Sequence, residues 1–356
     1  MILGNIILTA FSWVFRIAVN LRLLAYKYGV LPVRKVETRV VCVGNITMGG
    51  SGKTSVVIEV VRRLQDAGKN AVIISRGYRR RKEEEIRIVS DGKTIFLGSD
   101  EGGDEPVMLS ERCKGAPVIV GGDRYAAAKL AMTRFEPDVI VMDDGFQHVA
   151  LWRDIDLLVF DGTQDIQMLK MFPAGTLREP VKAMRRAKAA IVTKLNLTDD
   201  TQDVPGEIRS IAPELKIFHC SLEPVFLTNI HREELETNVS ELADRKIIAV
   251  CGIGNSAAFE RLLSDALGML ICRRFFFRDH HRYTDTDVEM IEGSRRSLGA
   301  EWVITTEKDA VKIEKATREP AVWRAVRTEV RLRPGDSDEF DAMLGDLFTN
   351  KMRIGY

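Results

Sequence analysis

The chain has 356 residues with 52 basic and 51 acidic side chains, so its formal net charge at pH 7 is +1. This length exceeds what one small core needs and suits two α/β domains. A balanced charge argues against a nucleic-acid binder, which usually shows a basic excess. The five cysteines are scattered and never form a C-x-x-C pair, so we expect neither a zinc site nor a disulfide framework.

The first 30 residues predict an apolar helix with a membrane role. Residues 1–19 hold a single charge, Arg16, which is compatible with a spanning helix. The polar side chains fall on one stripe about 80° wide, which favours a helix at the headgroup level; they are Asn5, Thr9, Ser12, Arg16, Asn20 and Lys27. No charged start or small-residue cleavage site marks a secretory signal. The alternative is an ordinary core helix packed on the domain.

A series of short apolar runs follows, each typical of a strand buried on both faces of a parallel sheet. Helical patterns separate several of them, at 53–67 and 124–135 for example. This alternation predicts a doubly wound, mostly parallel α/β sheet of the P-loop NTPase type. The predicted strands lie at 38–45, 70–75, 116–122, 137–144, 155–161 and 188–194.

A second, smaller α/β block is predicted after a polar, turn-forming stretch at 200–206. Its strands are expected at 215–220, 246–254, 272–277 and 301–306, and its helices at 256–267 and 338–348. The expected organisation is a membrane-associated helix over residues 1–30, a P-loop domain over 31–204 and a smaller α/β domain over 205–356.

The stretch VGNITMGGSGKTS (43–55) indicates a phosphate-binding loop. The usual spacing has a glycine where this chain has Thr47, at the expected bend of the loop. A buried strand nevertheless enters the loop and a helix leaves it, the arrangement in which backbone N–H groups hold phosphates. We predict that Lys53 meets the β- and γ-phosphates and that Thr54 ligates Mg²⁺. The predicted nucleotide-binding residues are Gly49, Gly50, Ser51, Gly52, Lys53, Thr54 and Ser55.

The strand at 137–144 ends in Asp143 and Asp144, followed by Gly-Phe-Gln-His. Ligands of open α/β sheets lie at the carboxyl ends of the strands. An acid at this place is what a phosphate loop requires to orient its metal, so Asp143 is the expected magnesium ligand. The alternative is an acid pair that only caps a turn.

Three further stretches carry reactive side chains in tight turns. GGDEP holds Asp104 and Glu105, FPAGTLREP holds Arg178 and Glu179, and RDHHRYT holds His280. No cysteine or histidine is spaced to complete a zinc site with the last stretch. A histidine acting as a base, or orienting one, is the better interpretation.

Together these motifs resemble the tetraacyldisaccharide 4'-kinase family. The resemblance covers about residues 40–312, and the apolar N-terminal helix also has a counterpart there. Thr47 is usual in this family, whereas Ser51 and Ser55 stand where Thr and Pro are usual. The motifs are, in order, VGNITMGGSGKT, SRGY, GDEP, DDGFQH, PAGTLREP, RDHHRYT and TEKDAVK.

The resemblance implies an ATP-dependent kinase at the cytoplasmic face of the bacterial inner membrane. Its γ-phosphoryl group would go to the 4'-hydroxyl of a tetraacylated glucosamine disaccharide 1-phosphate, the lipid A precursor. The implied base is a pair of Asp104 and His280, with His281 dispensable. Asp144 and His148 would hold substrate or metal-bound water, and Glu179 would assist Thr54 and Asp143 at Mg²⁺. The expected partners are this lipid and the membrane surface, with no nucleic acid and no obligate protein partner.

Two alternatives come from the residues themselves. A membrane-associated NTPase switch would also need a phosphate loop, although it would not need a base in a second domain. CGIGNSA (251–257) matches a dinucleotide-binding pattern after a strand and before a helix, but the acid expected at the end of the next strand is missing. A tight turn is the favoured interpretation of that stretch.

Overall fold

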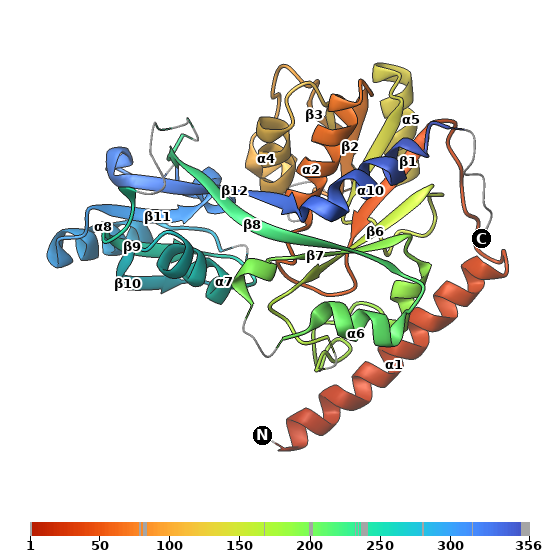
Figure 1. Cartoon of the computed structure of the whole chain (residues 1–356), viewed down its shortest axis with the longest axis horizontal. Helices are drawn as coiled ribbons and strands as arrows, with labels where there is room; N and C mark the ends of the chain where they lie inside the picture. Colours follow the sequence, from red (N-terminus) through yellow and green to blue (C-terminus); the bar gives the residue numbers. More distant parts are fainter. Residues whose placement is uncertain are drawn as a thin grey trace. The chain divides into compact units, whose positions relative to one another are not determined.

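The computed structural model describes residues 2–77, 80, 84–166, 168–198, 202–231, 233, 235, 241–279, 281–314 and 316–349, with side chains from residue 7 onward. The chain forms two compact units (Figure 1). The first comprises Met1–Ser221 and Leu332–Tyr356, and the second Leu222–Arg331. This division differs from the expected boundary after residue 204, because residues 205–221 and the C-terminal segment belong with the first unit.

A mostly parallel sheet forms the centre of the first unit. The strand order is β8-β7-β6-β1-β5-β2-β4-β3. Every neighbouring pair is parallel except β3 with β4. The predicted doubly wound fold is therefore confirmed, with an antiparallel edge strand that the apolar pattern did not indicate. The strands are β1 (Arg39–Gly44), β2 (Ala71–Ser75), β3 (Arg87–Ser90), β4 (Val118–Val120), β5 (Val139–Asp143), β6 (Ile155–Asp161), β7 (Ala189–Thr193) and the first part of β8 (Lys216–Asn229).

Helices cover both faces of this sheet because its strands are apolar on both sides. The alanines of α5 (Arg124–Phe135) pack on Cys42, Ile74 and Met142, which belong to alternate positions of β1, β2 and β5. α2 (Lys53–Asp66) contacts the same three strands with its buried valines, and successive strand residues face opposite sides. The other helices of this unit are α3 (Ser99–Gly102), α4 (Asp104–Arg112), α6 (Val204–Ile211) and α10 (Pro334–Gly345).

The N-terminal helix α1 (Ile2–Lys27) lies at the edge of the first unit (Figure 1). Its Ser12 hydroxyl donates to the carbonyl of Met171 (2.9 Å) and accepts from the amide of Ala174 (3.0 Å). Phe15 packs edge-on against Phe172, with ring centroids 5.6 Å apart. Ser12 therefore faces protein, while Thr9, Arg16, Asn20 and Lys27 of the polar stripe are exposed.

The opposite side of α1 is exposed and apolar. The stretch Ile7–Lys27 is long and apolar enough to cross a membrane, and little of it is buried. Six large side chains on that side are at least two-fifths exposed: Phe11, Trp13, Val14, Ile17, Leu21 and Leu24. An ordinary core helix would bury such side chains, so the core-helix alternative does not describe α1.

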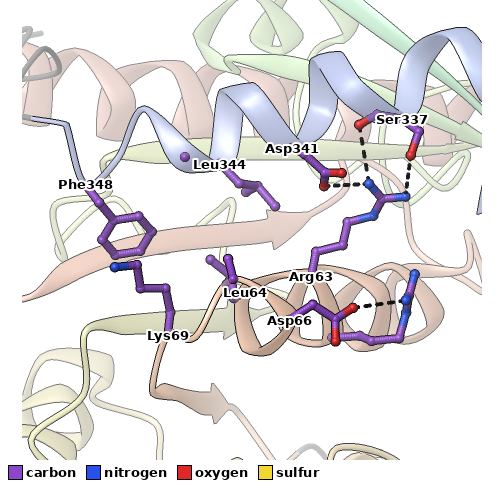
Figure 2. Close-up of a pocket in the computed structure, with 11 residues that line it drawn as sticks. Arg63, Leu64, Asp66, Lys69, Ser337, Asp341, Leu344 and Phe348 are labelled. Atoms are coloured by element: carbon purple, nitrogen blue, oxygen red, sulfur yellow. Dashed lines mark hydrogen bonds and ion pairs between the residues drawn. The ribbon is translucent and has the colours of Figure 1, made fainter.

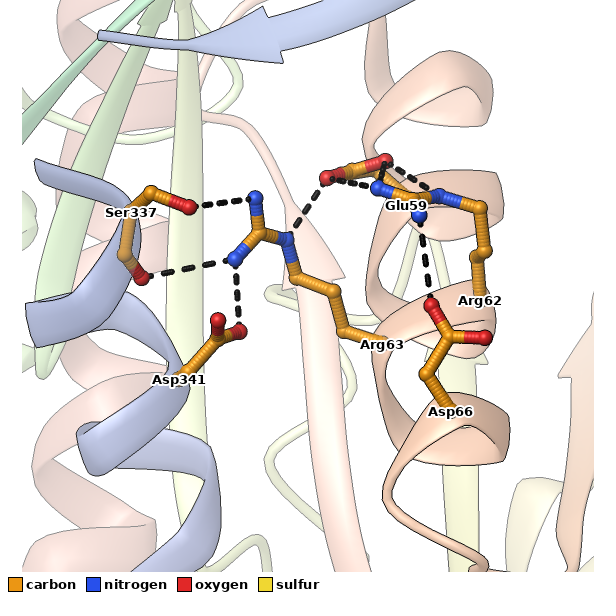
Figure 3. A network of polar contacts seen from close by, with 6 residues as sticks. All are labelled: Glu59, Arg62, Arg63, Asp66, Ser337 and Asp341. Carbon is orange, nitrogen blue, oxygen red and sulfur yellow. Dashed lines mark hydrogen bonds and ion pairs between the residues drawn. The ribbon is translucent and has the colours of Figure 1, made fainter. Parts of the chain in front are cut away.

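The C-terminal helix α10 joins the end of α2 through a charged network (Figure 3). Arg63 Nε donates to Glu59 (2.6 Å), and its Nη1 reaches Asp341 (2.6 Å). The Ser337 hydroxyl accepts from the same guanidinium at 3.0 Å. Because Glu59 and Arg63 are one turn apart on α2, this network fixes α10 to the helix that follows the phosphate loop.

In the second unit, strands are ordered β10-β9-β11-β12 and each of these neighbours pairs in parallel. Helix α8 begins with a capping box in which Thr284 and Asp287 each bond the other's backbone amide. In the core, the buried Trp323 donates its indole N–H to Glu292 (2.9 Å). The elements are β9 (Lys246–Cys251), α7 (Ser256–Arg261) continued by a π-helical turn at Leu262–Ala266, β10 (Leu270–Phe276), α8 (Asp285–Leu298), β11 (Trp302–Thr306), α9 (Glu307–Ile313) and β12 (Trp323–Leu332).

Candidate active site

The carboxyl ends of the strands of the first unit bring polar residues to one edge of the sheet. β1 lies between β6 and β5, and β5 lies next to β2. Val43, just before the phosphate loop, is in register with Asp143 at the end of β5. Because parallel strands end at the same edge, the phosphate loop, the acid pair and Ser75 of β2 come together there.

Two glycines give the phosphate loop its shape. Gly49 and Gly52 have φ angles of 109° and 85°, which favour glycine, and Gly52 directly precedes α2. The side-chain amide of the buried Asn45 donates to the hydroxyls of Thr47 (3.3 Å) and Ser51 (3.0 Å). Hydrogen bonds within the protein therefore connect the start of the loop to its middle and hold its shape.

The structure gives Thr47 a role other than the expected bend. Its backbone forms an antiparallel bridge with Leu177. On either side, the Met48 amide donates to Thr176 (2.7 Å) and the Arg178 amide donates to Ile46 (2.8 Å). An extended, paired residue does not need glycine, so a side chain is accommodated at position 47.

Lys53 lies beside Asp144, with its Nζ 3.6 Å from Oδ1. Arg178 donates to both oxygens of the same carboxylate at 3.0 and 2.9 Å. Burial alone would raise the pKa of Asp144, but the charges of Lys53 and Arg178 and the bonds from Arg178 lower it to about 2. Asp144 is thus a fixed anion between two cations, in a left-handed backbone conformation with φ 49°.

Asp143 has the opposite electrostatic environment. Its buried carboxyl accepts from the Ser75 hydroxyl (2.9 Å), and its Oδ1 has no hydrogen-bond partner among the residues that the structure describes. Burial, followed by the nearby charges of Glu105 and Asp144, raises its pKa to about 7. An unsatisfied carboxylate oxygen among other acids fits a divalent cation, which supplies the missing positive charge. Within the described ranges, no three His, Cys, Asp or Glu side chains are grouped as a metal site.

Glu179 directly follows Arg178 in the LREP stretch. Its side chain is fully buried, and its carboxylate lies 2.9 Å from Nη2 of Arg186. Arg186 in turn stacks over the ring of Phe146, 4.4 Å from its centroid. Burial raises the pKa of Glu179 against the opposing charge of Arg186. Arg186 is thus the cation nearest to this carboxylate, and ligation of a metal by Glu179 stays a prediction.

His148 follows the acid pair in a half-buried turn, where its amide donates to Gly145 (2.8 Å). Burial and the charges of Arg124, Arg153 and Arg22 lower its pKa to about 4, against a small opposing effect of Asp123. The imidazole is therefore neutral at pH 7. A neutral ring is able to hydrogen-bond substrate or water, as expected, but is a weak base at that pH.

Asp104 and Glu105 begin helix α4 after Gly103, whose φ is 93°. A Cβ at Gly103 would lie 3.3 Å from the Cα of Gly77. The GDEP stretch therefore packs closely against the backbone of Gly77, which follows β2. The negative charge of Glu105 contributes to the raised pKa of Asp143. The first turn of α4 therefore lies near the same edge of the sheet.

His280 lies outside the described residues, but its neighbours in the second unit are well held. His281 stacks on Phe277, with centroids 4.2 Å apart, and its Nε2 lies 3.1 Å from Asp287. Asp279 pairs with Lys308 of the TEKDAVK stretch at 3.3 Å. His281 therefore has packing and hydrogen-bond contacts of its own, and its dispensability for activity stays a prediction.

The glycine turn after β9 is occupied by a protein side chain. The buried carboxylate of Asp309 accepts the amide of Gly252 (2.8 Å), the Thr306 hydroxyl (2.9 Å) and the Lys312 ammonium (3.0 Å). A Cβ at Gly252 would lie 3.3 Å from Asp309 Oδ1. The glycine thus makes room for Asp309, which favours the tight-turn interpretation over a dinucleotide site.

A groove of about 580 Å³ lies between α2 and α10 (Figure 2). Arg63, Leu64, Lys69, Asp341, Leu344 and Phe348 are among its lining residues. α2 has 14 residues, so at about 1.5 Å per residue the groove lies about 20 Å from the loop at the other end of the helix. It contains none of the candidate residues.

Four residues of this edge were missed or given no role by sequence reasoning: Asn45, Ser75, Glu105 and Arg178. Asn45 and Ser75 each lie at the end of a predicted strand, which is a usable signal in this fold class. Glu105 and Arg178 were noticed in their turns, but only their contacts with the acid pair define what they do.

Comparisons with known proteins agree on one family. The family model described as tetraacyldisaccharide-1-P 4'-kinase matches residues 4–349. A tetraacyldisaccharide 4'-kinase of Halothermothrix orenii is 35% identical, covering 87% of this chain and 83% of the relative. That of Geobacter metallireducens is 37% identical, with 86% and 88% covered.

A solved structure agrees with them. LpxK from Aquifex aeolicus, described in complex with ATP, aligns with a TM-score of 0.77 and 29% identity, over 98% of this chain and all of that one. The family match spans nearly the whole chain, both units included. We conclude that the chain belongs to the tetraacyldisaccharide 4'-kinase family and is an ATP-dependent phosphotransferase of lipid A biosynthesis.

Proposed function

We propose that the protein transfers the γ-phosphoryl group of ATP to the 4'-hydroxyl of a tetraacylated glucosamine disaccharide 1-phosphate. The observation that carries this proposal is the edge of the first sheet. There Lys53 of the phosphate loop lies beside the fixed anion Asp144, and the neighbouring Asp143 has a buried oxygen without a hydrogen-bond partner among the described residues. Phosphoryl transfer depends on charge neutralisation and alignment, and these groups supply both.

The nucleotide would be held by the loop from Gly49 to Ser55. Its amides and the N-terminus of α2 favour phosphate oxygens, and Lys53 would meet the β- and γ-phosphates. Asp143 and the Thr54 hydroxyl would hold Mg²⁺, which neutralises charge on the phosphates when bound. Arg178 keeps Asp144 aligned beside Lys53, so the loop and the acid pair form one rigid donor site.

For the acceptor proton, the proposed base is Asp104 with His280 as its partner. Asp104 is half-buried in the first turn of α4. It precedes Glu105, whose charge raises the pKa of Asp143. A carboxylate there would take the proton of the 4'-hydroxyl, and the histidine would orient or relay it. Removal of either side chain should lower kcat sharply, and removal of both should cost little more than the worse single change. Strictly additive losses would overturn this pairing.

The acceptor lipid stays in a bilayer, and α1 suits that location. Ser12, near the middle of the helix, bonds the Met171–Ala174 loop. A helix with protein packed against its middle is poorly placed to span the bilayer. We therefore propose that α1 lies in the plane of the cytoplasmic face of the inner membrane, with Val14, Ile17 and Leu21 toward the acyl chains.

Flotation with vesicles tests this placement. Replacing Ile17 and Leu21 together by Asn should release the protein from vesicles and slow transfer to lipid held in vesicles. The rate with lipid in detergent micelles should hardly change. Asn20→Ser, on the polar stripe, is the matched control. Unchanged flotation of the double variant would overturn the proposed placement of α1.

The decisive experiment for the function is transfer of the labelled γ-phosphate from ATP to purified disaccharide lipid in detergent. The expected product is the 4'-phosphorylated lipid, formed only when the acceptor is present. A membrane-associated NTPase switch would instead release inorganic phosphate at the same rate with and without lipid. That outcome would overturn the proposed reaction.

A further inference from the structure

Lys194 reaches the phosphate loop from the end of β7. It directly follows Thr193, has a left-handed backbone with φ 60°, and is 6% exposed. Its Nζ donates to the carbonyl of Gly50 (2.9 Å) and pairs with the fully buried carboxylate of Asp161 at the end of β6. The buried ammonium of Lys194 thus connects the ends of β6 and β7 to the phosphate loop, which follows β1.

Thr193 makes the neighbouring contact. Its hydroxyl donates to the carbonyl of Ser51 (3.0 Å), with the carbonyl of Phe160 as a second, more distant acceptor (3.2 Å). A Cβ on Gly52 would lie 3.2 Å from the same hydroxyl oxygen, so the loop packs closely on this side chain. Two consecutive carbonyls of the loop, those of Gly50 and Ser51, are therefore bound by consecutive residues at the end of β7.

Fixing these carbonyls also fixes the direction of the loop amides. In a planar trans peptide the C=O and N–H groups point in opposite directions. Holding the carbonyl of Ser51 on Thr193 therefore turns the N–H of Gly52 away from β7. Phosphate binding by such a loop depends on amides pointing to a common centre.

We infer that Lys194, Asp161 and Thr193 form a clamp that holds the phosphate loop in its phosphate-binding shape. They are positioning residues, since they act through the loop and not on the phosphates. Asp161 holds the ammonium in place and also accepts from the amide (3.0 Å) and hydroxyl (2.6 Å) of Thr163. The inference rests on the proposed binding of ATP by this loop.

Lys194→Met tests the clamp but leaves the carboxylate of Asp161 buried without its cation, which destabilises a fold strongly. The double change Asp161→Asn with Lys194→Met removes that charge while the bond to Gly50 stays broken. We expect the thermal midpoint to fall in the single variant and to recover largely in the double variant. Affinity for ATP should stay about tenfold weaker in both, as expected for loss of a bond from a charged donor.

Affinity for AMP separates the clamp from a general structural effect. AMP lacks the β- and γ-phosphates, so its affinity should change by less than about twofold in the double variant. Thr193→Val should also lower the affinity for ATP, by a smaller factor. Thr193→Ser, which keeps the hydroxyl, should have the affinity of the natural protein. Arg39→Met is the matched control, because Arg39 pairs with Asp154 at the opposite end of β1.

Calorimetric titration with ATP and AMP, beside thermal unfolding, decides the result. ATP affinity that recovers together with stability in the double variant would show that the pair is merely structural. Equal weakening of ATP and AMP would also overturn the clamp. Failure of the proposed function is distinguishable, because the natural protein would then show no acceptor-dependent transfer in the same preparation.

Discussion

The loop after β1 and the loop after β9 both follow a buried parallel strand, carry glycines and lead into a helix. In the first, the nearest acid to the loop lysine is Asp144, which Arg178 holds from outside the loop. In the second, Asp309 enters the turn and accepts the amide of Gly252. The difference lies in the residues contributed by neighbouring elements. Glycine spacing alone therefore does not distinguish a ligand-binding turn from one that is already filled by the protein.

Lys53→Ala should give the largest effect at the first loop. It removes the charge that meets the β- and γ-phosphates, so kcat should fall by about a hundredfold to a thousandfold. Initial rates of labelled phosphate transfer measure this, with circular dichroism to confirm folding. Retention of more than about a tenth of the natural kcat would remove the functional distinction between the two loops.

Asp143→Asn should act through the metal and should change the pH dependence of stability. The pKa of Asp143, about 7 in the fold, lies above the value of about 3.9 for an unfolded chain. The folded state thus binds the proton more tightly, and this contribution to stability is full below about pH 4 and is lost as the pH rises through about 7.

Mg²⁺ should therefore raise the thermal midpoint of the natural protein more at about pH 8 than at about pH 6, because metal and proton compete. Asp143→Asn should lose that difference, and its transfer rate should fall by about a hundredfold, with partial recovery at high Mg²⁺. A magnesium response that persists unchanged in the variant would argue against ligation by Asp143.

Asp309→Asn tests the second loop, where the expected effect is on stability. An amide keeps the shape but leaves Lys312 without its buried partner, so unfolding should become easier by about 3 kcal/mol. ATP affinity should stay within about twofold, because the bonds that the change weakens, to Gly252 and Lys312, lie within the second unit. Denaturant unfolding and nucleotide titration measure the two quantities. A large loss of ATP affinity would contradict the contrast.

The smallest effects come from a matched pair of glycines. Gly52→Ala places a Cβ at φ 85° and 3.2 Å from Thr193 Oγ1, and should weaken ATP binding. Gly252→Ala places a Cβ 3.2 Å from His281 Cβ, and should cost about 1 kcal/mol of stability without weakening ATP binding. Titration and thermal unfolding of both variants compare the loops directly. If both variants weakened ATP binding equally, the proposed functional difference between the two loops would be wrong.

Much of the fold could be predicted from apolar periodicity, because strands buried on both faces are continuous apolar runs. β1, β2, β5, β6 and β7 lie within one or two residues of their expected ranges. The edge strand β3 (RIVS) is too short and polar for that signal. β12 mixes buried and partly buried residues and has four charges among its ten residues, so it did not appear as a buried run.

The residues of the candidate site that lie at strand ends could be predicted from the sequence. The roles that depend on side-chain contacts with distant residues could not. Lys53 and Asp143 follow from the loop and the strand pattern. The pairing of Glu179 with Arg186 depends on a fold that buries Glu179 and places Arg186 over the ring of Phe146. Lys194 contacts Gly50 from far along the chain, and the order of β7, β6 and β1 brings them together. Such contacts are long-range, and residue spacing does not encode them.

The ion pair between Lys53 and Asp144 means that the lysine of the phosphate loop already has an anionic partner within the protein. An incoming anion must exchange with a carboxylate that Arg178 already holds. For a monovalent anion this exchange gains little, because one negative charge replaces another. A triphosphate arrives with several charges and gains contacts along the whole loop. We therefore expect chloride and other monovalent anions to compete weakly with ATP, so that the site selects its ligand by charge number before it recognises the nucleoside.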